Sequence, residues 1–174
     1  GIRGTLGKWA FGSLRYLPDG SENPDFILNR EPYRDAEILV TGPNFGCGSS
    51  REGAVWSLQE RGIRAIIGSG FGDIFFANCF QNGILPVVLD KAVIDSLAAE
   101  IEASQGAGRL SVDLEAQTVT SPSGVRHVFE IDPRRRAGLL EGLDEISLTL
   151  RRDHEIRAFQ AADRNARPWI HFAG

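Results

Sequence analysis

The sequence predicts an α/β fold with a core of parallel strands and a small antiparallel meander, and two patterns carry this prediction. Three short apolar runs, at 37–41, 64–68 and 84–89, alternate with segments of helical spacing. Such alternation is typical of parallel strands joined by crossover helices. Between residues 109 and 131, apolar residues recur at every second position, as in antiparallel strands separated by tight turns.

In the N-terminal half, the turn-forming residues Gly, Pro, Asn and Asp are frequent over 1–35, so we expect a surface segment with little regular structure. A glycine-rich loop over 42–48 follows the first strand. Ser49 and Glu52 then form the pattern of a capping box, in which the serine caps a helix and the glutamate reaches back. We expect this helix to begin at Ser49 and to end just before Gly62.

Further helices are expected on each side of the last apolar run and after the meander. Apolar residues at helical spacing, with turn or capping residues at the ends, predict helices over 73–81, 90–104, 133–141 and 143–164. The tail, 165–174, contains Pro168 and two aromatic residues and is expected on the surface. Basic runs at 134–136 and 151–152 are interpreted as solvated faces. The alternatives are contact with a partner subunit or, for 151–152, pairing with a helix C-terminus.

Composition excludes several classes of function. A chain of 174 residues suits one domain or one subunit, and its net charge of −4 disfavours a nucleic-acid-binding protein. The longest apolar stretch, 84–89, is far too short to cross a membrane. Two cysteines make no disulfide framework, so a cytoplasmic location is expected.

The feature richest in chemistry is the segment 44–52, which reads Asn-Phe-Gly-Cys-Gly-Ser-Ser-Arg-Glu. Gly46 and Gly48 allow backbone amides to point into open space, and the following helix start adds unpaired N–H donors and partial positive charge. Arg51 adds a planar fork that suits a carboxylate or phosphate. The segment therefore predicts a site for a small anion.

Two known nucleotide loops do not fit this segment, because it lacks the third glycine of the dinucleotide motif and the Gly-Lys-Ser/Thr of a Walker A loop. A purely structural interpretation stays open: Ser49 only caps the helix, and the glycines only make a tight turn.

The segment 46–52 resembles the signature of the aconitase-type swivel domain, and most closely that of the 3-isopropylmalate dehydratase small-subunit family. Other stretches along nearly the whole chain agree with that family, at 20–26, 33–36, 69–76, 82–86, 112–114 and 140–149. The resemblance implies that 1–174 form a single swivelling, three-layer β/β/α domain.

The resemblance implies that this chain contributes one half of an active site and a partner subunit contributes the other. Such a chain would work with a large subunit that holds a [4Fe–4S] cluster, and together they would isomerise 2- and 3-isopropylmalate by dehydration and rehydration in leucine biosynthesis. This chain would hold no metal or cofactor itself. Its partners would be the large subunit and a small dicarboxylate substrate, without nucleic acid or membrane.

The family roles transfer by motif to five residues. Ser49 would be the catalytic base, and Ser50 and Arg51 would bind a substrate carboxylate. Gly48 and Cys47 complete the predicted substrate-binding set. A serine can act as a base only if donors and positive charge stabilise its oxyanion, and the helix start with Arg51 would supply both.

Two departures from the family pattern leave the substrate open. Gly53 stands where the family usually has histidine, and glycine within a helix costs up to about 1 kcal/mol, so we expect a packing or functional reason for it. The family's N-terminal strand and substrate-selecting loop are also missing from this sequence. A related hydro-lyase subunit acting on citraconate or dimethylmalate is therefore one alternative. A stand-alone carboxylate-binding module and a scaffold with a vestigial serine motif are two others.

Remaining candidates for metal chemistry are few. A cluster needs three or four thiolates, and Cys47 and Cys79 are too few and 32 positions apart. Cys79 is expected in the core, and Cys47 is either a small loop residue or a neighbour of the partner's cluster. The histidines match no zinc spacing; they are His127, His154 and His171.

Overall fold

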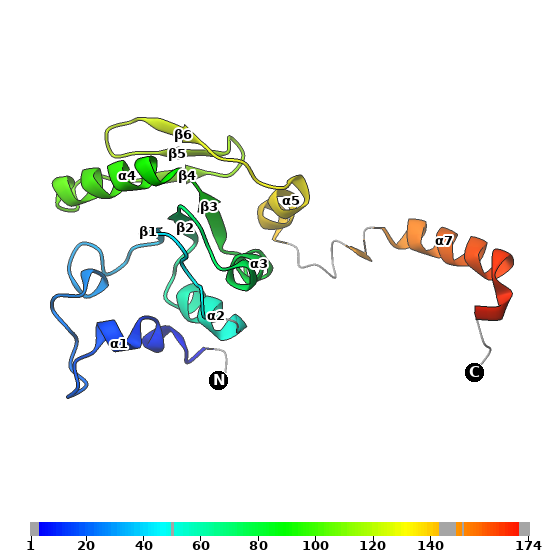
Figure 1. Ribbon diagram of the computed structural model, residues 1–174, viewed down its shortest axis with the longest axis horizontal. Helices are drawn as coiled ribbons and strands as arrows, with labels where there is room; N and C mark the ends of the chain where they lie inside the picture. Colours follow the sequence, from blue (N-terminus) through cyan, green and yellow to red (C-terminus); the bar gives the residue numbers. More distant parts are fainter. Residues whose placement is uncertain (1–3, 50, 143–148, 151, 171–174) are drawn as a thin grey trace.

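The computed structural model describes residues 4–49, 51–142, 149–150 and 152–170. Its core is a parallel sheet of order β1-β2-β3, formed by β1 (Ile38–Thr41), β2 (Ala65–Gly68) and β3 (Leu85–Val88). Two helices, α2 (Glu52–Glu60) and α3 (Asp73–Gln81), connect the strands in turn (Figure 1). The predicted parallel core is confirmed, and each strand lies inside its expected range.

Alternating side chains divide the parallel sheet into two buried faces. Leu39 pairs with Ile66 in register, and both face α2 and α3. Their neighbours Val40 and Ile67 face the opposite side. Because both faces are covered, the strands consist almost entirely of apolar residues.

The first face is covered by the two crossover helices. The core on this side joins strand residues to apolar side chains of α2 and α3: Val55, Leu58, Phe75 and Cys79. On the second face lie α4 (Lys91–Ser104) and an antiparallel sheet, with Leu97, Val119 and Phe129 packed against the strands.

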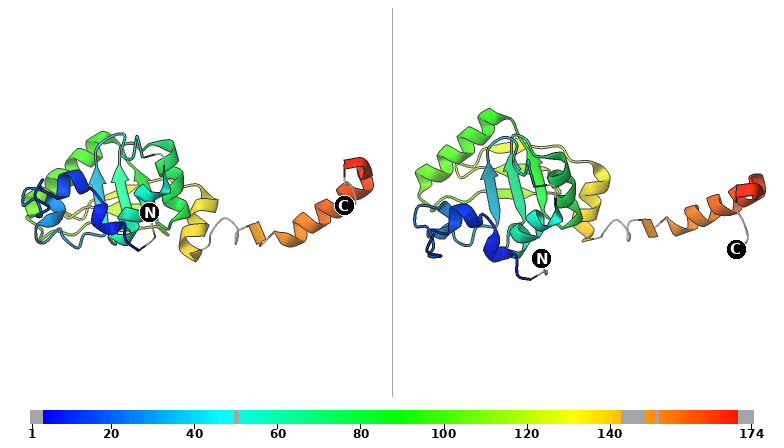
Figure 2. Two further views of the ribbon diagram at one scale, coloured as in Figure 1. Left: turned by 90° about the horizontal axis from the view of Figure 1, so that it is seen from below. Right: turned by 60° about the horizontal axis from the view of Figure 1, so that its bottom comes forward.

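The antiparallel sheet has the order β4-β5-β6, from β4 (Ser111–Asp113), β5 (Thr118–Thr120) and β6 (Arg126–Val128). It is the predicted meander, and it completes a three-layer arrangement of helices, parallel sheet and meander with α4 (Figure 2). The expected β/β/α layering is therefore confirmed.

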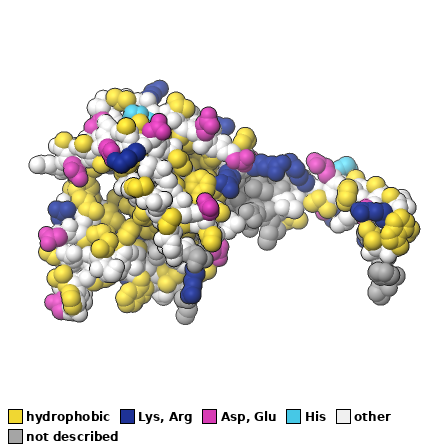
Figure 3. All heavy atoms as spheres, viewed as in Figure 1, with side chains coloured by type: hydrophobic (Ala, Val, Ile, Leu, Met, Phe, Trp, Pro, Cys, Tyr) yellow, Lys and Arg dark blue, Asp and Glu magenta, His cyan; other side chains and the backbone are white. Residues whose placement is uncertain are grey.

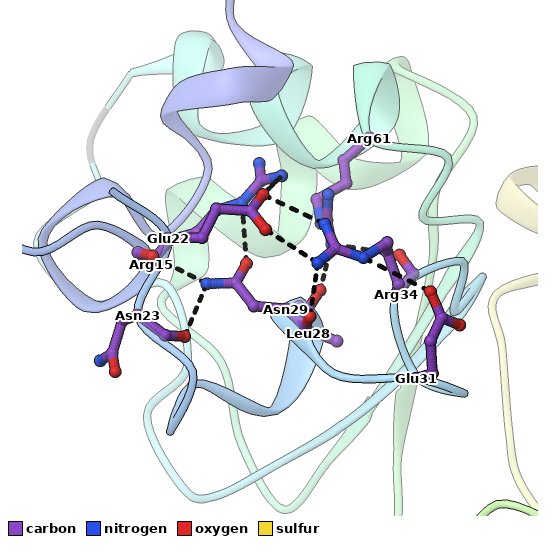
Figure 4. A network of polar contacts seen from close by, with 8 residues as sticks. All are labelled: Arg15, Glu22, Asn23, Leu28, Asn29, Glu31, Arg34 and Arg61. Carbon is purple, nitrogen blue, oxygen red and sulfur yellow. Dashed lines mark hydrogen bonds and ion pairs between the residues drawn. The ribbon is translucent and has the colours of Figure 1, made fainter. Parts of the chain in front are cut away.

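The N-terminal segment is more regular than its turn-rich composition indicates. It contains three short helical turns, η1 (Gly7–Trp9), α1 (Gly12–Arg15) and η2 (Ile27–Asn29). A polar network joins α1 to η2, and in it the Arg15 Nε donates to Asn29 Oδ1 at 3.2 Å (Figure 4). Asn29 Nδ2 in turn donates to the Arg15 carbonyl oxygen at 2.8 Å. Side-chain bonds of this kind have no periodic signature in sequence.

The helix α5 (Pro133–Glu141) begins as predicted, with the Asp132 side chain accepting from the amides of Arg134 and Arg135 at 2.9 and 3.1 Å. The basic run here is more than a solvated face. The Arg135 guanidinium lies 4.7 Å from the centre of the Phe80 ring, and Arg136 donates to two backbone carbonyls of the meander.

The helix expected over 143–164 is confirmed for α7 (Asp153–Ala166), which is followed by η3 (Pro168–Ile170). The prediction is wrong at Arg152, which lies in a turn and is the N-cap of α7. Residues 143–148 and 151 lie outside the described residues. The helix projects away from the layered body and exposes apolar side chains, among them Phe159 (Figures 1 and 3). None of the described helices is long and apolar enough to cross a membrane.

Candidate active-site loop

The loop between β1 and α2 lies at the carboxyl end of the parallel sheet, where α/β proteins usually bind ligands. Two backbone hydrogen bonds join it to the loop that follows β2. The Phe45 amide donates to the Gly70 carbonyl at 3.1 Å, and the Gly72 amide donates to the Phe45 carbonyl at 2.9 Å. These bonds hold the two loops side by side at the carboxyl ends of β1 and β2.

Close packing against α3 fixes the shape of this loop. Gly46 has a φ of +77°, and a Cβ placed there would lie 2.2 Å from Cγ of Phe75. Gly72 approaches the loop from the other side, because a Cβ on it would lie 3.1 Å from Cα of Cys47. Gly48 also has a positive φ, of +86°, but faces open space. Two constraints therefore require glycine at position 46: the positive φ of its backbone and the closeness of the Phe75 ring.

The predicted capping box is wrong. The helix α2 begins at Glu52, and its N-cap is Arg51, whose backbone is still extended at φ −130° and ψ 142°. The Ser49 amide, which a capping box would pair with Glu52, instead donates to the Gly46 carbonyl at 2.9 Å. The reason is the turn at Gly46 and Gly48, which places Ser49 before the helix rather than at its cap.

This correction strengthens the case for an anion site. The Arg51 side chain makes no capping bond, so it leaves the first-turn amides of α2 to other acceptors. The Arg51 guanidinium is exposed and has no hydrogen bond or ion pair with another described residue. The start of α2 therefore offers N–H donors, partial positive charge and an unpaired guanidinium to a ligand.

The structure brings four of the five predicted site residues together in this one loop. Ser49 is half-buried, whereas Cys47, Gly48 and Arg51 are exposed. Ser50 lies outside the described residues, and its contact with the substrate stays a prediction.

Close packing does not explain why residue 53 is a glycine. It lies in the first turn of α2, and a Cβ on it would meet nothing within 4 Å. Of the two expected reasons for this glycine, close packing is therefore wrong, and a functional one stays a prediction.

The two cysteines differ in environment. Cys79 is fully buried, as predicted, and burial raises the pKa of its thiol to about 12. Cys47 is exposed on the loop. Within the described ranges, no three His, Cys, Asp or Glu side chains gather in a way that could hold a metal ion.

We expect one of the two thiols to react with a thiol reagent in the native protein. The exposed Cys47 should be labelled at neutral pH, whereas the buried, protonated Cys79 should react only after unfolding. Mass spectrometry after labelling with and without denaturant counts the modified thiols. Two labelled cysteines in the native protein would contradict the burial of Cys79.

Hydrogen bonds that the sequence does not predict hold α2 at the carboxyl end of α3. Asn82, which is buried, accepts from Trp56 Nε1 at 2.9 Å and donates from Nδ2 to the Asn78 carbonyl at 2.9 Å. Gln59 Nε2 donates to the Asn82 backbone carbonyl at 2.8 Å. This link fixes α2 against α3. In sequence, Asn82 followed by Gly83 indicates only a turn.

Comparison with known protein families shows the class of protein to which this chain belongs. The family model of the aconitase C-terminal domain matches residues 3–92, just over half of the chain. Two further family models match parts of the C-terminal half. LeuD_N matches residues 95–133, and the C-terminal domain of the 3-isopropylmalate dehydratase small subunit matches residues 145–173. The chain therefore contains an aconitase-type domain.

Relatives narrow the class to one family. The chain is 54% identical over 167 residues to the 3-isopropylmalate dehydratase small subunit of Gluconacetobacter diazotrophicus, covering 96% of this chain and 80% of the relative. It is 51% identical to the small subunit of Jannaschia sp., covering 97% and 83%. A solved 3-isopropylmalate dehydratase from Methanocaldococcus jannaschii has a TM-score of 0.55 and 25% identity, covering 76% and 75%. The chain belongs to the 3-isopropylmalate dehydratase small-subunit family.

Proposed function

We propose that this chain, bound to a large subunit with a [4Fe–4S] cluster, interconverts 2- and 3-isopropylmalate by dehydration and rehydration in leucine biosynthesis in the cytoplasm. We further propose that 1–174 act as a single swivel domain. The observation that carries the proposal is the start of α2. There Ser49 precedes an Arg51 that has no hydrogen bond or ion pair from its side chain to another described residue and does not cap the first-turn amides. Its support is the high identity to relatives named as small subunits of this dehydratase.

In this proposal Ser49 removes the proton next to a substrate carboxylate. A serine oxyanion is very unstable in water, so the reaction needs donors that are already in place. The turn at Gly46 and Gly48 puts Ser49 just before the helix start, whose partial positive charge favours the anionic form.

Arg51 binds a substrate carboxylate through its planar fork, with Ser50 beside it. Gly48 and Cys47 are exposed in the same loop. The Cys47 amide already donates to the Asn44 carbonyl at 3.1 Å, so the Gly48 amide is the donor of this pair that is offered to the carboxylate. An anchored carboxylate holds the adjacent carbon in reach of Ser49. A dicarboxylic acid is therefore the natural substrate class.

The cluster is proposed to lie on the large subunit. This chain's donor set does not suit a cluster, because Cys79 is a buried, protonated thiol and Cys47 is a single exposed one. On the large subunit, the cluster would supply a Lewis acid for the departure of the hydroxyl group. The residues of this chain bind the carboxylate and move the proton.

Replacing Arg51 with glutamine should raise the KM of the reconstituted enzyme for isopropylmalate by about tenfold or more, because a charge-assisted carboxylate contact is lost. The turnover number should fall less, since Ser49 remains in place. Steady-state kinetics with both subunits measures the two parameters.

A matched control is Arg64→Gln. Arg64 is exposed, and its ion pair with Glu37 is long, at 4.0 Å. It should leave both kinetic parameters unchanged. Equal KM values for Arg51→Gln and the unaltered enzyme would show that Arg51 does not bind the substrate.

A further inference from the structure

A hollow lies at the carboxyl end of α2, away from the candidate active-site loop. It has a volume of about 540 Å³ and is lined by the backbone near Gly4 and by four charged side chains, Lys8, Arg15, Glu60 and Arg61. Glu60 and Arg61 end the helix whose beginning carries the loop. A helix of this length places the two ends about 13 Å apart, so the hollow is separate from the proposed substrate site.

Positive charge exceeds negative charge around this hollow. Three of the four charged side chains that line it are cations. The single lining carboxylate, that of Glu60, accepts hydrogen bonds from the backbone amides of Gly4, Leu6 and Gly7 at 2.5, 2.6 and 2.8 Å. Because these amides engage it, the carboxylate ties the N-terminal segment to α2.

Arg61 is a half-buried cation that has no ion-pair partner among the described residues. Its Nη2 donates to the carbonyl oxygens of Leu28 and Arg34, at 2.7 and 3.1 Å, and no described carboxylate lies within ion-pair distance of it (Figure 4). Burial, followed by the nearby charges of Arg15 and Arg34, lowers the pKa of its guanidinium. The opposing effect of Glu22 is smaller.

The carboxylates next to the hollow are already engaged, by Arg34 and by the lining residue Arg15. Glu22 lies 2.8 Å from Arg34 and 3.5 Å from Arg15, and Glu31 lies 3.5 Å from Arg34 (Figure 4). Arg15 is itself 8% exposed, so its charge is largely removed from water. Two arginines thus face a hollow that contains no free carboxylate among the described residues, and Lys8 stands at its edge.

We propose that this hollow binds a small multivalent oxyanion, either phosphate or a short dicarboxylate, between Lys8, Arg15 and Arg61. Cationic side chains that converge on a concave, partly desolvated surface recognise phosphate and carboxylate groups. A bound anion would also hold the N-terminal segment on α2, because the hollow is lined by both. The proposal is independent of the proposed enzymatic function.

The test is a titration of the whole chain with inorganic phosphate and, separately, with malonate, at constant ionic strength. Backbone amide signals in NMR spectra report the position of binding. We expect saturable shifts at Gly4, Leu6 and Gly7, and we expect them to persist in Arg51→Gln, which disables the loop site. Binding of only one of the two probes identifies whether the natural ligand is a phosphate or a carboxylate.

Variants locate the site. Lys8→Gln should weaken binding about threefold and Arg61→Gln about tenfold or more, because each removes a charge-assisted contact. The control Lys91→Gln, which changes an exposed lysine paired with Asp95, should bind like the unaltered chain. If Arg61→Gln does not fold, Lys8→Gln decides the question.

Three results would overturn the proposal. The first is the absence of saturable binding of either anion. The second is loss of all binding in Arg51→Gln, which would assign the anion to the loop. The third is equal affinity in Lys8→Gln and Lys91→Gln.

Discussion

Replacing Ser49 with alanine should lower the turnover number of the reconstituted two-subunit enzyme by about 10²–10⁴-fold, the usual contribution of a general base. The KM should change little, because Arg51 and the helix amides still bind the carboxylate. Anaerobic assays of isopropylmalate dehydration with the large subunit in excess measure both parameters.

Ser57→Ala is the matched control for this substitution. Ser57 lies in α2, the helix that follows Ser49, and its hydroxyl donates to the Ala54 carbonyl at 2.7 Å. Its removal should leave turnover unchanged, and both variants should bind the large subunit normally. Full activity in Ser49→Ala would end the catalytic assignment and favour a scaffold with a vestigial serine motif.

Replacing Gly46 with alanine should lower the free energy of unfolding by about 3 kcal/mol, through left-handed strain and overpacking together. The new Cβ would lie 2.2 Å from Cγ of Phe75, and the ring has little freedom because Phe75 is buried and packs edge-on against Phe45. Relief of the clash would move the loop, so activity should fall as well. Denaturant unfolding and activity assays measure the two effects.

Gly53→Ala is the control, because it adds the same methyl group seven positions further along, in open space within α2. It should leave stability unchanged or raise it by up to about 1 kcal/mol, since alanine favours the helix. Equal stability of the two variants would contradict the described packing of the loop against α3.

Most of the fold could be predicted because its signals are local and periodic. Apolar runs marked the three parallel strands, and the predicted helices at 73–81 and 133–141 coincide with α3 and α5. The meander followed from alternation of period two. The N-terminal segment could not be predicted, because its helical turns depend on contacts with distant residues, such as that of the Glu60 carboxylate with three backbone amides.

The candidate site could be predicted because its residues are contiguous. One glycine-rich segment contains all of them, so no knowledge of the fold was needed to group them. The local geometry was harder to predict. The capping-box pattern at Ser49 and Glu52 competes with the turn at Gly48, and the turn prevails, leaving Arg51 at the helix start.

The central claim is tested most directly by reconstitution. The chain and the large subunit of a 3-isopropylmalate dehydratase are co-expressed and purified anaerobically, and iron content and conversion of 3-isopropylmalate are measured for the complex and for each subunit alone. We expect a stable, iron-containing complex that converts the substrate and no activity in this chain alone. An iron-loaded complex that converts neither isopropylmalate would contradict the proposed substrate, and failure to form any complex would contradict the subunit role.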